Sequence, residues 1–443
     1  MSLDRDELNK RRQAREEQRR ERQKKRRRQT MLRVLLAMLV LAACGLGIGL
    51  MAQNSAPTES QEAMSGQVVE MPETMPENTT EETEAEAWTK APATAHIVAG
   101  GDLNITDKVI WSGQSSTNFD YTEAFIDVAP LLSEADLAVL NFEGNVCGTP
   151  YGTATASAPV ELVQALKRAG VDLLQLANSC SIQNGLIGLT TTLSTIRSTG
   201  IEPLGAYTSV SEAEKAKGYT ICKVNDITIA FVAFTKGVGS LGMPEGSESC
   251  VNLLYTDYYT TYQEVDTAGI TKILKAVQAE KPDITIALLH WGSEHNDTIY
   301  DTQTQIVSLM KKNGVNAIIG SHPHRVLEVE YDENTGFLVA YSLGDFFGDG
   351  TKSGTNYSVL LDLQITKDFE TGVTKITDWD FTPLYTLSES EACDNQRRVI
   401  RIENAISAYD LNYVNKVTDE GYAGIKNALD RIVARITGEF RGE

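Results

Sequence analysis

An apolar run that ends directly in His-Pro-His is the feature that most constrains how this chain can fold. Residues 317–319 are apolar, as in a buried strand, and a Gly-Ser pair then leads into His322 and His324. Residues two apart in an extended segment project to the same side, and Pro323 between them fixes one backbone dihedral. The two imidazoles can therefore converge on one point, where they either hold a metal or form a plain surface turn.

Histidines gather in two short segments of the chain. There are five histidines in 443 residues, and besides His322 and His324 the pair His290 and His295 follows a second apolar run, 284–289. A random scatter rarely places so many histidines directly after apolar runs. The clustering favours a site built from imidazoles. Taken alone, His290 also fits a histidine that is buried in the core with its hydrogen bonds satisfied.

The order of strand and helix patterns indicates an α/β fold with mixed sheets. Strand and helix patterns alternate first and hairpin patterns follow, so we expect both parallel and antiparallel pairing. Gly170 after one helix and Asn225-Asp226 between two strands are typical stop and turn signals. Strands are expected at 94–100, 136–141, 172–177, 201–206, 284–289 and 317–319; helices at 125–132, 159–169, 186–198, 270–279 and 302–313; hairpins at 219–234, 326–342 and 357–383; and a helical tail at 398–437.

Polar side chains follow several of the predicted strands. In open α/β sheets, ligands bind outside the carboxyl ends of the strands. Carboxylates and imidazoles from several strand ends are the ligand set of one or two first-row divalent metals, and a pair of metals about 3.5–4 Å apart can activate water for hydrolysis. Singly, Asp102 also fits a turn and Glu143 a surface carboxylate. The residues at these ends are Asp102, Glu143, 178–180, His290, His322 and His324.

The charge of the chain narrows the class of partner. The formal net charge is −20, from 40 basic and 60 acidic residues. A body this acidic lacks the basic face that nucleic acid requires, so we expect no nucleic-acid partner. An anionic substrate remains compatible if a metal supplies local positive charge.

The N-terminal part predicts a membrane anchor followed by a tether. A basic tail, 1–30, precedes the segment 31–52, whose last 19 residues carry no charge, close to the ~20 apolar residues that span a bilayer. The acidic stretch 53–92 has too few apolar residues to fold. The positive-inside rule places the N-terminus in the cytoplasm and the body outside the cell. Alternatively, Leu-Ala-Ala-Cys-Gly around Cys44 resembles a lipoprotein cleavage box.

The cysteines form no recognisable framework. Six are present, with no Cys-x-x-Cys spacing, which argues against a zinc knuckle or a disulfide-stapled domain. Outside the apolar segment five remain, an odd number, so at least one should be free.

The ordered set of motifs resembles the CapA family of poly-γ-glutamate capsule biosynthesis proteins, which is similar to the calcineurin-like metallophosphatases. The resemblance covers roughly 95–383, within an expected domain at 93–390 and ahead of a helical segment at 391–443. It is carried by Gly101-Asp102, Asn141-Phe142-Glu143, Ala177-Asn178 with Gly185, His290-Trp291-Gly292 with Glu294, Gly320-Ser321-His322-Pro323-His324 and Tyr341-Ser342-Leu343-Gly344-Asp345-Phe346.

The resemblance implies a four-layer α/β/β/α sandwich with a divalent metal site, holding Mn, Zn or Fe, at the strand ends. By position, the residues that inherit metal-ligand roles are Asp102, Glu143, His290, His322 and His324. The resemblance further implies that the substrate is an anionic surface polymer or another molecule bearing phosphate or amide groups. It also implies polymer-synthase partners in the membrane.

The chain departs from the family pattern at one motif. Where the family reads Ala-Asn-Asn-His, this chain has Ser179 and Cys180 in the last two places, and Asp345 replaces the usual Asn of the last motif. Cys180 is a candidate catalytic residue, because its thiolate could bind zinc. Alternatively, Cys180 is an inert thiol. Glu294 and Asp345 are candidates for orienting the ligands.

Two classes of function follow from this pattern. The first is a membrane-anchored, extracellular, metal-dependent hydrolase in surface-polymer synthesis, release or attachment. The second is a degenerate protein that binds an anionic polymer or a cell-wall component without turning it over. The replacements at Ser179 and Cys180 separate the two, because they remove a phosphate-facing histidine that the resemblance implies.

Overall fold

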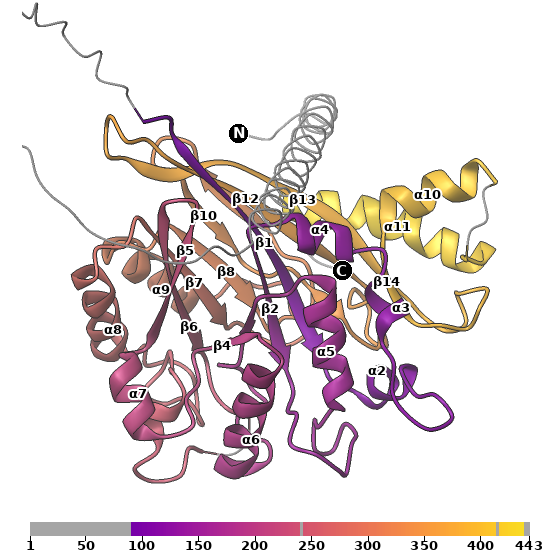
Figure 1. Ribbon diagram of the computed structural model, residues 1–443, viewed down its shortest axis with the longest axis horizontal. Coiled ribbons are helices and arrows are strands. Elements are labelled where there is room, and N and C mark those ends of the chain that lie inside the picture. The colour runs from indigo at the N-terminus through magenta and orange to yellow at the C-terminus, as the bar shows by residue number, and fades with distance from the viewer. Residues whose placement is uncertain (1–89, 240–241, 413–415, 438–443) are drawn as a thin grey trace, which may run out of the picture. The chain divides into compact units, whose positions relative to one another are not determined.

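The larger of two mixed β-sheets runs through the middle of the computed structural model, which describes residues 90–239, 242–412 and 416–437 (Figure 1). Its strands lie in the order β14-β13-β12-β1-β2-β3-β4, and β11 also pairs with β1. Strands β1 to β4 run parallel to one another. Strand β12 is antiparallel to β1, β13 to β12, and β14 to β13. The bounds are β1 (Ala93–Asn104), β2 (Leu137–Glu143), β3 (Leu173–Gln175), β4 (Glu202–Leu204), β11 (Asp345–Phe347), β12 (Tyr357–Lys367), β13 (Thr374–Leu387) and β14 (Arg398–Arg401).

The second sheet is also mixed, in the order β5-β6-β7-β8-β10-β9. Strands β6, β7, β8 and β10 are parallel, and the two outer strands are antiparallel to their neighbours. The bounds are β5 (Tyr219–Val224), β6 (Ile227–Thr235), β7 (Ile284–His290), β8 (Ala317–Ser321), β9 (Val329–Asp332) and β10 (Phe337–Ala340). The expected mixed α/β class is therefore confirmed.

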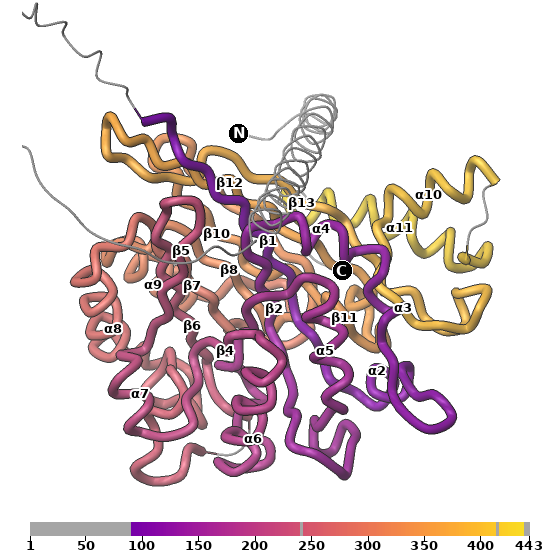
Figure 2. The backbone as a smooth tube through the Cα atoms, viewed as in Figure 1, coloured from indigo at the N-terminus to yellow at the C-terminus, as the bar shows by residue number. Residues whose placement is uncertain are grey.

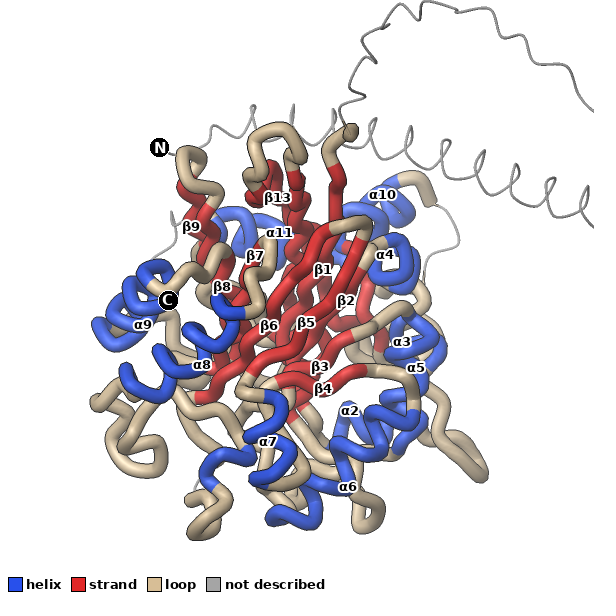
Figure 3. The backbone as a smooth tube through the Cα atoms, turned by 60° about the vertical axis from the view of Figure 1, so that its left-hand side comes forward, coloured by secondary structure: helices blue, strands red, loops and turns tan. Residues whose placement is uncertain are grey.

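Helices cover the outer sides of the two sheets (Figure 3). On one side lie α8 and α9, and on the other lie α3, α4 and α5 (Figures 1 and 3). The bounds are α2 (Asp107–Ser112), α3 (Thr122–Phe125), α4 (Ala129–Glu134), α5 (Val160–Ala169), α6 (Gly185–Ser198), α7 (Val210–Ala216), α8 (Thr267–Ala279), α9 (Asp301–Lys312), α10 (Ile402–Asp410) and α11 (Asp419–Ile436), with a short 3₁₀ turn at Glu248–Cys250.

The alternation of side chains along the second sheet explains the layers. Successive residues of a strand point to opposite faces. On β6, Phe231 belongs to the core shared with Ile97 of the first sheet, whereas its neighbour Val232 packs in a separate core with Ile270 of α8 and Ile306 of α9. The two sheets thus face each other, and helices close the outer faces.

Local signals account for several elements. Helix α5 ends at Gly170, whose φ of 109° is left-handed and whose N–H donates to Leu166 O and Lys167 O. The β5–β6 turn has positive φ at both Asn225 and Asp226, as a two-residue hairpin of type I′ requires. The predicted stop and the predicted hairpin are both confirmed.

Two predicted helices differ in the structure. The pattern at 125–132 forms two short helices, α3 and α4, instead of one. The start of the predicted helical tail is wrong, because Arg398–Arg401 is strand β14, paired with the edge of β13. Val399 and Ile400 at its centre are β-branched and bury their side chains, which favours a strand over a helix.

The predicted membrane anchor at 31–52 and the tether at 53–92 lie outside the described residues, apart from the last few residues of the tether. Among the helices that the structure describes, none combines the length and the apolar character needed to cross a bilayer.

Candidate metal centre

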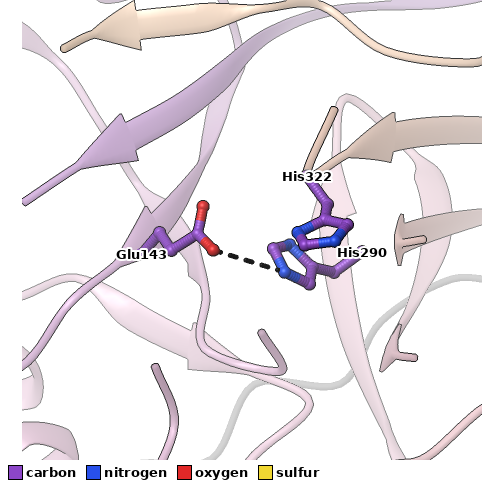
Figure 4. Close-up of side chains that lie close together, drawn as sticks. All are labelled: Glu143, His290 and His322. Atoms are coloured by element: carbon purple, nitrogen blue, oxygen red, sulfur yellow. Dashed lines mark ion pairs between the residues drawn. The ribbon is translucent and has the colours of Figure 1, made fainter. Parts of the chain in front are cut away.

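The ends of four strands, two from each sheet, bring polar side chains together. In the first sheet, Asp102 on β1 lies beside Asn141 on β2, and Glu143 follows two residues later. In the second sheet, His290 at the end of β7 pairs with Ser321 at the end of β8. Because the two sheets face each other, Glu143 Oε1 lies 3.4 Å from His290 Nε2 (Figure 4).

Two groups of possible metal ligands share Glu143. In one group, Glu143 lies with His290 and His322, and in the other with Asp102 and His324. Within each group, one ligand atom from every residue lies within 4.8 Å of the others, and all five residues are buried. The structure thus brings together all five residues that the sequence predicts as ligands. A carboxylate shared between two groups is suited to bridge a pair of metals.

Unpartnered buried atoms at this place fit a metal. Glu143 Oε2 and His322 Nδ1 are buried and have no hydrogen-bond partner among the described residues, and the ion-pair contact of Glu143 Oε2 with His324 Nε2 is long, at 3.6 Å. Leaving such atoms unsatisfied costs roughly 1–3 kcal/mol each, which coordination would remove. His322 also has a φ of 94°, a strained backbone for a non-glycine residue of the kind that clusters at functional sites. The donor set of carboxylates and imidazoles matches Zn, Mn or Fe.

The electrostatics of the cluster reflect its burial. Burial raises the pKa of Glu143 to about 8 and that of Asp102 to about 6. Burial likewise holds the pKa of His290 and His322 well below the ordinary value, so both imidazoles are neutral near pH 7. Burial alone would lower the pKa of His324, but the nearby carboxylates, led by Asp345, raise it well above the usual range.

A network of amides and a hydroxyl holds the ligands in place. Asn141 Nδ2 donates to Asp102 Oδ1 at 2.6 Å, and Asn178 Nδ2 donates to Asn141 Oδ1 at 3.1 Å. The Ser179 N–H donates to His290 Nε2 at 3.2 Å, and the Ser179 hydroxyl donates to Glu143. No role is predicted for Asn141 or Asn178 from the sequence, although each is a polar residue at or just after the end of a buried strand.

The three predicted catalytic residues are placed differently. Asp345 Oδ1 lies 2.7 Å from His324 Nδ1, a contact that orients this imidazole. Glu294 is exposed, and one of its oxygens lies within 4.8 Å of ligand atoms of His322 and His324. Cys180 joins none of the ligand groups among the described residues, and burial raises the pKa of its thiol far above the ordinary value. This thiol is therefore neutral near pH 7.

His295 is a further residue at the centre. Its ring lies 5.4 Å from that of His324, its Nδ1 is buried without a partner among the described residues, and its φ is 53°. No role is predicted for His295 from the sequence. Its spacing after His-Trp-Gly was the available signal.

The C-terminal helix is tied to the segment that follows His295. Arg435 on α11 donates to both oxygens of Asp297, at 2.8 and 3.0 Å, and also to Val326 O at 3.3 Å. Arg325, next to His324, contacts the same carboxylate at 3.4 Å. Helix α11, yellow in Figure 2, therefore links the end of the chain to the candidate metal centre.

Comparison with known proteins gives a consistent picture. The family model described as "Bacterial capsule synthesis protein PGA_cap" matches residues 96–349. The chain is 27% identical over 318 residues to the PGA biosynthesis protein CapA of Bacillus subtilis, covering 71% of this chain and 77% of that protein. It is 27% identical over 246 residues to the capsule biosynthesis protein CapA of Bacillus anthracis, covering 54% and 56%.

Among solved structures, the calcineurin-like phosphoesterase YfkN from Bacillus subtilis is similar at 15% identity. The match covers 77% of this chain and 98% of that chain, with a TM-score of 0.40. At so low a TM-score the likeness carries no weight in assigning a function.

Proposed function

Because the chain belongs to the PGA_cap family of bacterial capsule synthesis proteins, we propose that it is a CapA-like, metal-dependent hydrolase acting on an anionic surface polymer. The reaction would serve the synthesis, release or attachment of capsule or of a poly-γ-glutamate-like chain. The observation that carries the proposal is the buried Glu143, which two groups of ligand-type side chains share. The helix–sheet–sheet–helix layering also agrees with the metallophosphatase-like fold that the sequence implies.

The ligand-type residues divide between two metal positions. Asp102, Glu143 and His324 would hold one divalent metal, and Glu143, His290 and His322 the other. When bound, such metals supply an activated water and an electrophilic clamp for a phosphoryl or amide oxygen.

The surrounding residues orient these ligands. Asn141 fixes the Asp102 carboxylate, Asp345 fixes the His324 ring, and Ser179 contacts both Glu143 and His290. Glu294, exposed at the centre, is positioned to accept a proton from the reacting water or to contact the substrate.

A binding protein without turnover is the second candidate. It is favoured by Cys180, which stands where the resemblance implies a histidine and whose neutral, partly buried thiol is a poor proton donor at neutral pH. The metal positions do not depend on this residue, so the second candidate also predicts a metal-containing protein.

A screen of metals and substrates tests the proposal. The purified chain, loaded in turn with Mn²⁺, Zn²⁺ or Fe²⁺, should release product from phosphate esters or from a γ-glutamyl polymer, and a chelator should abolish that release. Metal content is measured in parallel on the same samples. Bound metal without turnover of either substrate class would favour the binding protein, and a chain that takes up no metal would contradict both candidates.

We also propose a single-pass anchor in the bacterial cell membrane through 31–52, with the N-terminus in the cytoplasm, the body outside and polymer-synthase proteins as neighbours. The basic tail before the apolar segment and the acidic linker after it support this orientation. Protease added to intact cells should cut within 53–92 and release the body, as followed by immunoblotting. A body that stays protected while an N-terminal tag is digested would reverse the orientation, and a lipid on Cys44, detected by mass spectrometry, would replace the helix by a lipoprotein anchor.

A further inference from the structure

Lys236 directly follows β6, at the edge of the sheet that carries the histidines. Its neighbour Thr235 pairs with His290 in the parallel ladder, and the Lys236 N–H donates to His290 O at 2.7 Å. The side chain reaches along this edge, and Nζ donates to Gly292 O at 2.6 Å. The ammonium group therefore sits beside the His-Trp-Gly turn that delivers His290.

The charge of Lys236 is not neutralised by a dedicated carboxylate. The side chain is half-buried, and it forms no ion pair with any residue in the described part of the chain. Its other contact is the face of the Tyr262 ring, 4.4 Å from Nζ to the centroid, which attracts a cation without cancelling its charge. Burial lowers the pKa of Lys236, and Glu294 partly offsets that effect.

The ammonium group of Lys236 affects the electrostatics of the candidate metal centre. Its charge contributes, after burial and His324, to the lowered pKa of His290, and after burial and His290 to that of His322. An ammonium has three N–H donors, and Gly292 O accepts from one. The remaining donors, in a partly desolvated place, are suited to an oxyanion.

We propose that Lys236 binds an anionic group of the substrate, a carboxylate or a phosphate oxygen, beside the metal centre. This inference rests on the proposed function and deepens it, because it names the residue that contacts the anionic group of the substrate. A chain with a net charge of −20 repels an anionic polymer. A cation held next to the reacting group offsets that repulsion where the substrate must dock.

The test measures anion affinity in the full-length, Mn²⁺-loaded protein by titration calorimetry. The probes are inorganic phosphate, an N-acetylated γ-linked glutamate tripeptide, and the same tripeptide with its free carboxyl groups converted to amides, which is uncharged. Lys236→Met should weaken binding of the matching anionic probe by roughly tenfold or more, whereas Lys236→Arg retains most of the affinity. The uncharged tripeptide should bind equally to the wild type and to Lys236→Met. Lys272→Met, at an exposed lysine of α8, is the matched control and should bind like the wild type.

The two anionic probes distinguish the source of the oxyanion. If Lys236→Met loses affinity for phosphate alone, the group that Lys236 binds is a phosphate ester. If it loses affinity for the glutamate tripeptide alone, the group is a carboxylate of the polymer. Equal affinity of wild type and Lys236→Met for both anions, or no binding of either by the wild type, overturns the inference. So does a loss of metal or an earlier melting transition in both Lys236→Met and Lys236→Gln, since that outcome assigns a structural role. If the wild type takes up no metal, the proposed function is contradicted. If that metal-free protein still binds the anions more tightly than Lys236→Met does, the inference about Lys236 holds.

Discussion

The Glu143→Gln variant is expected to lose metal from both positions of the centre and to melt, in the presence of Mn²⁺, like the chelator-treated wild type. Both ligand groups contain this carboxylate, so its loss affects each of them. Glutamine keeps the shape of the side chain but is a weak ligand. Because burial raises the pKa of Glu143 to about 8, the metal-free carboxyl is largely neutral at pH 7, and glutamine changes the metal-free fold little.

The size of the effect follows from linkage. Metal at a hundred times its dissociation constant stabilises the native state by about 2.7 kcal/mol, and each kcal/mol shifts the melting temperature by about 2–4 °C, so a difference of roughly 5–10 °C is expected. Metal content is measured by mass spectrometry and melting by calorimetry. Glu214→Gln, at an exposed residue of α7, should match the wild type. Equal metal content in Glu143→Gln and wild type would contradict a shared bridging ligand.

The largest expected change in rate comes from Ser179→Asn combined with Cys180→His. The wild type should hydrolyse generic phosphate esters poorly, because the partly buried Cys180 thiol is neutral and a poor proton donor to a leaving group at neutral pH. Restoring the imidazole should raise the rate by roughly 10²–10⁴-fold, the usual contribution of general acid catalysis. His322→Ala, which removes a ligand-type side chain, should abolish whatever activity remains.

The control for this pair of changes is Cys393→His, at an exposed cysteine, which should leave the rate unchanged. Rates are compared at equal metal content, so that a change in metal binding is not mistaken for a change in catalysis. Brisk wild-type activity that disappears in Cys180→Ser would show that the thiol itself takes part. If the double variant also fails to turn over esters and γ-glutamyl amides, the binding-protein candidate takes the lead.

Sequence patterns predicted those parts of the molecule that depend on local order. Apolar runs ending in His290 or His322 mark strand ends, and parallel strands bring such ends to one edge. The convergence of Asp102, Glu143 and the histidines could therefore be predicted, while their role as ligands stays a prediction. The split of 125–132 into two helices and the strand at Arg398–Arg401 depend on packing against other elements, which periodicity does not reveal.

The residues around the site were harder to predict for a related reason. Lys236 follows a strand that ends without a histidine or carboxylate, and its importance appears only when β6 lies beside β7. The contact of Asn141 with Asp102 joins β2 to β1, and the contact of Asn178 with Asn141 joins the segment after β3 to β2. Each of these contacts depends on the register of neighbouring strands, which a single sequence specifies only weakly.

The bond between Asp297 and Arg435 sets an order of assembly for the emerging chain. The two residues are 138 positions apart, and Arg435 lies in the last turn of α11. A chain made from its N-terminus contains every ligand-type residue of the centre before Arg435 has been synthesised. Among the described residues made before Arg435, Arg325 is the one that forms an ion pair with Asp297, at 3.4 Å. Helix α11 is thus made after every ligand-type residue of the centre, and a product that stops before Arg435 lacks this tie.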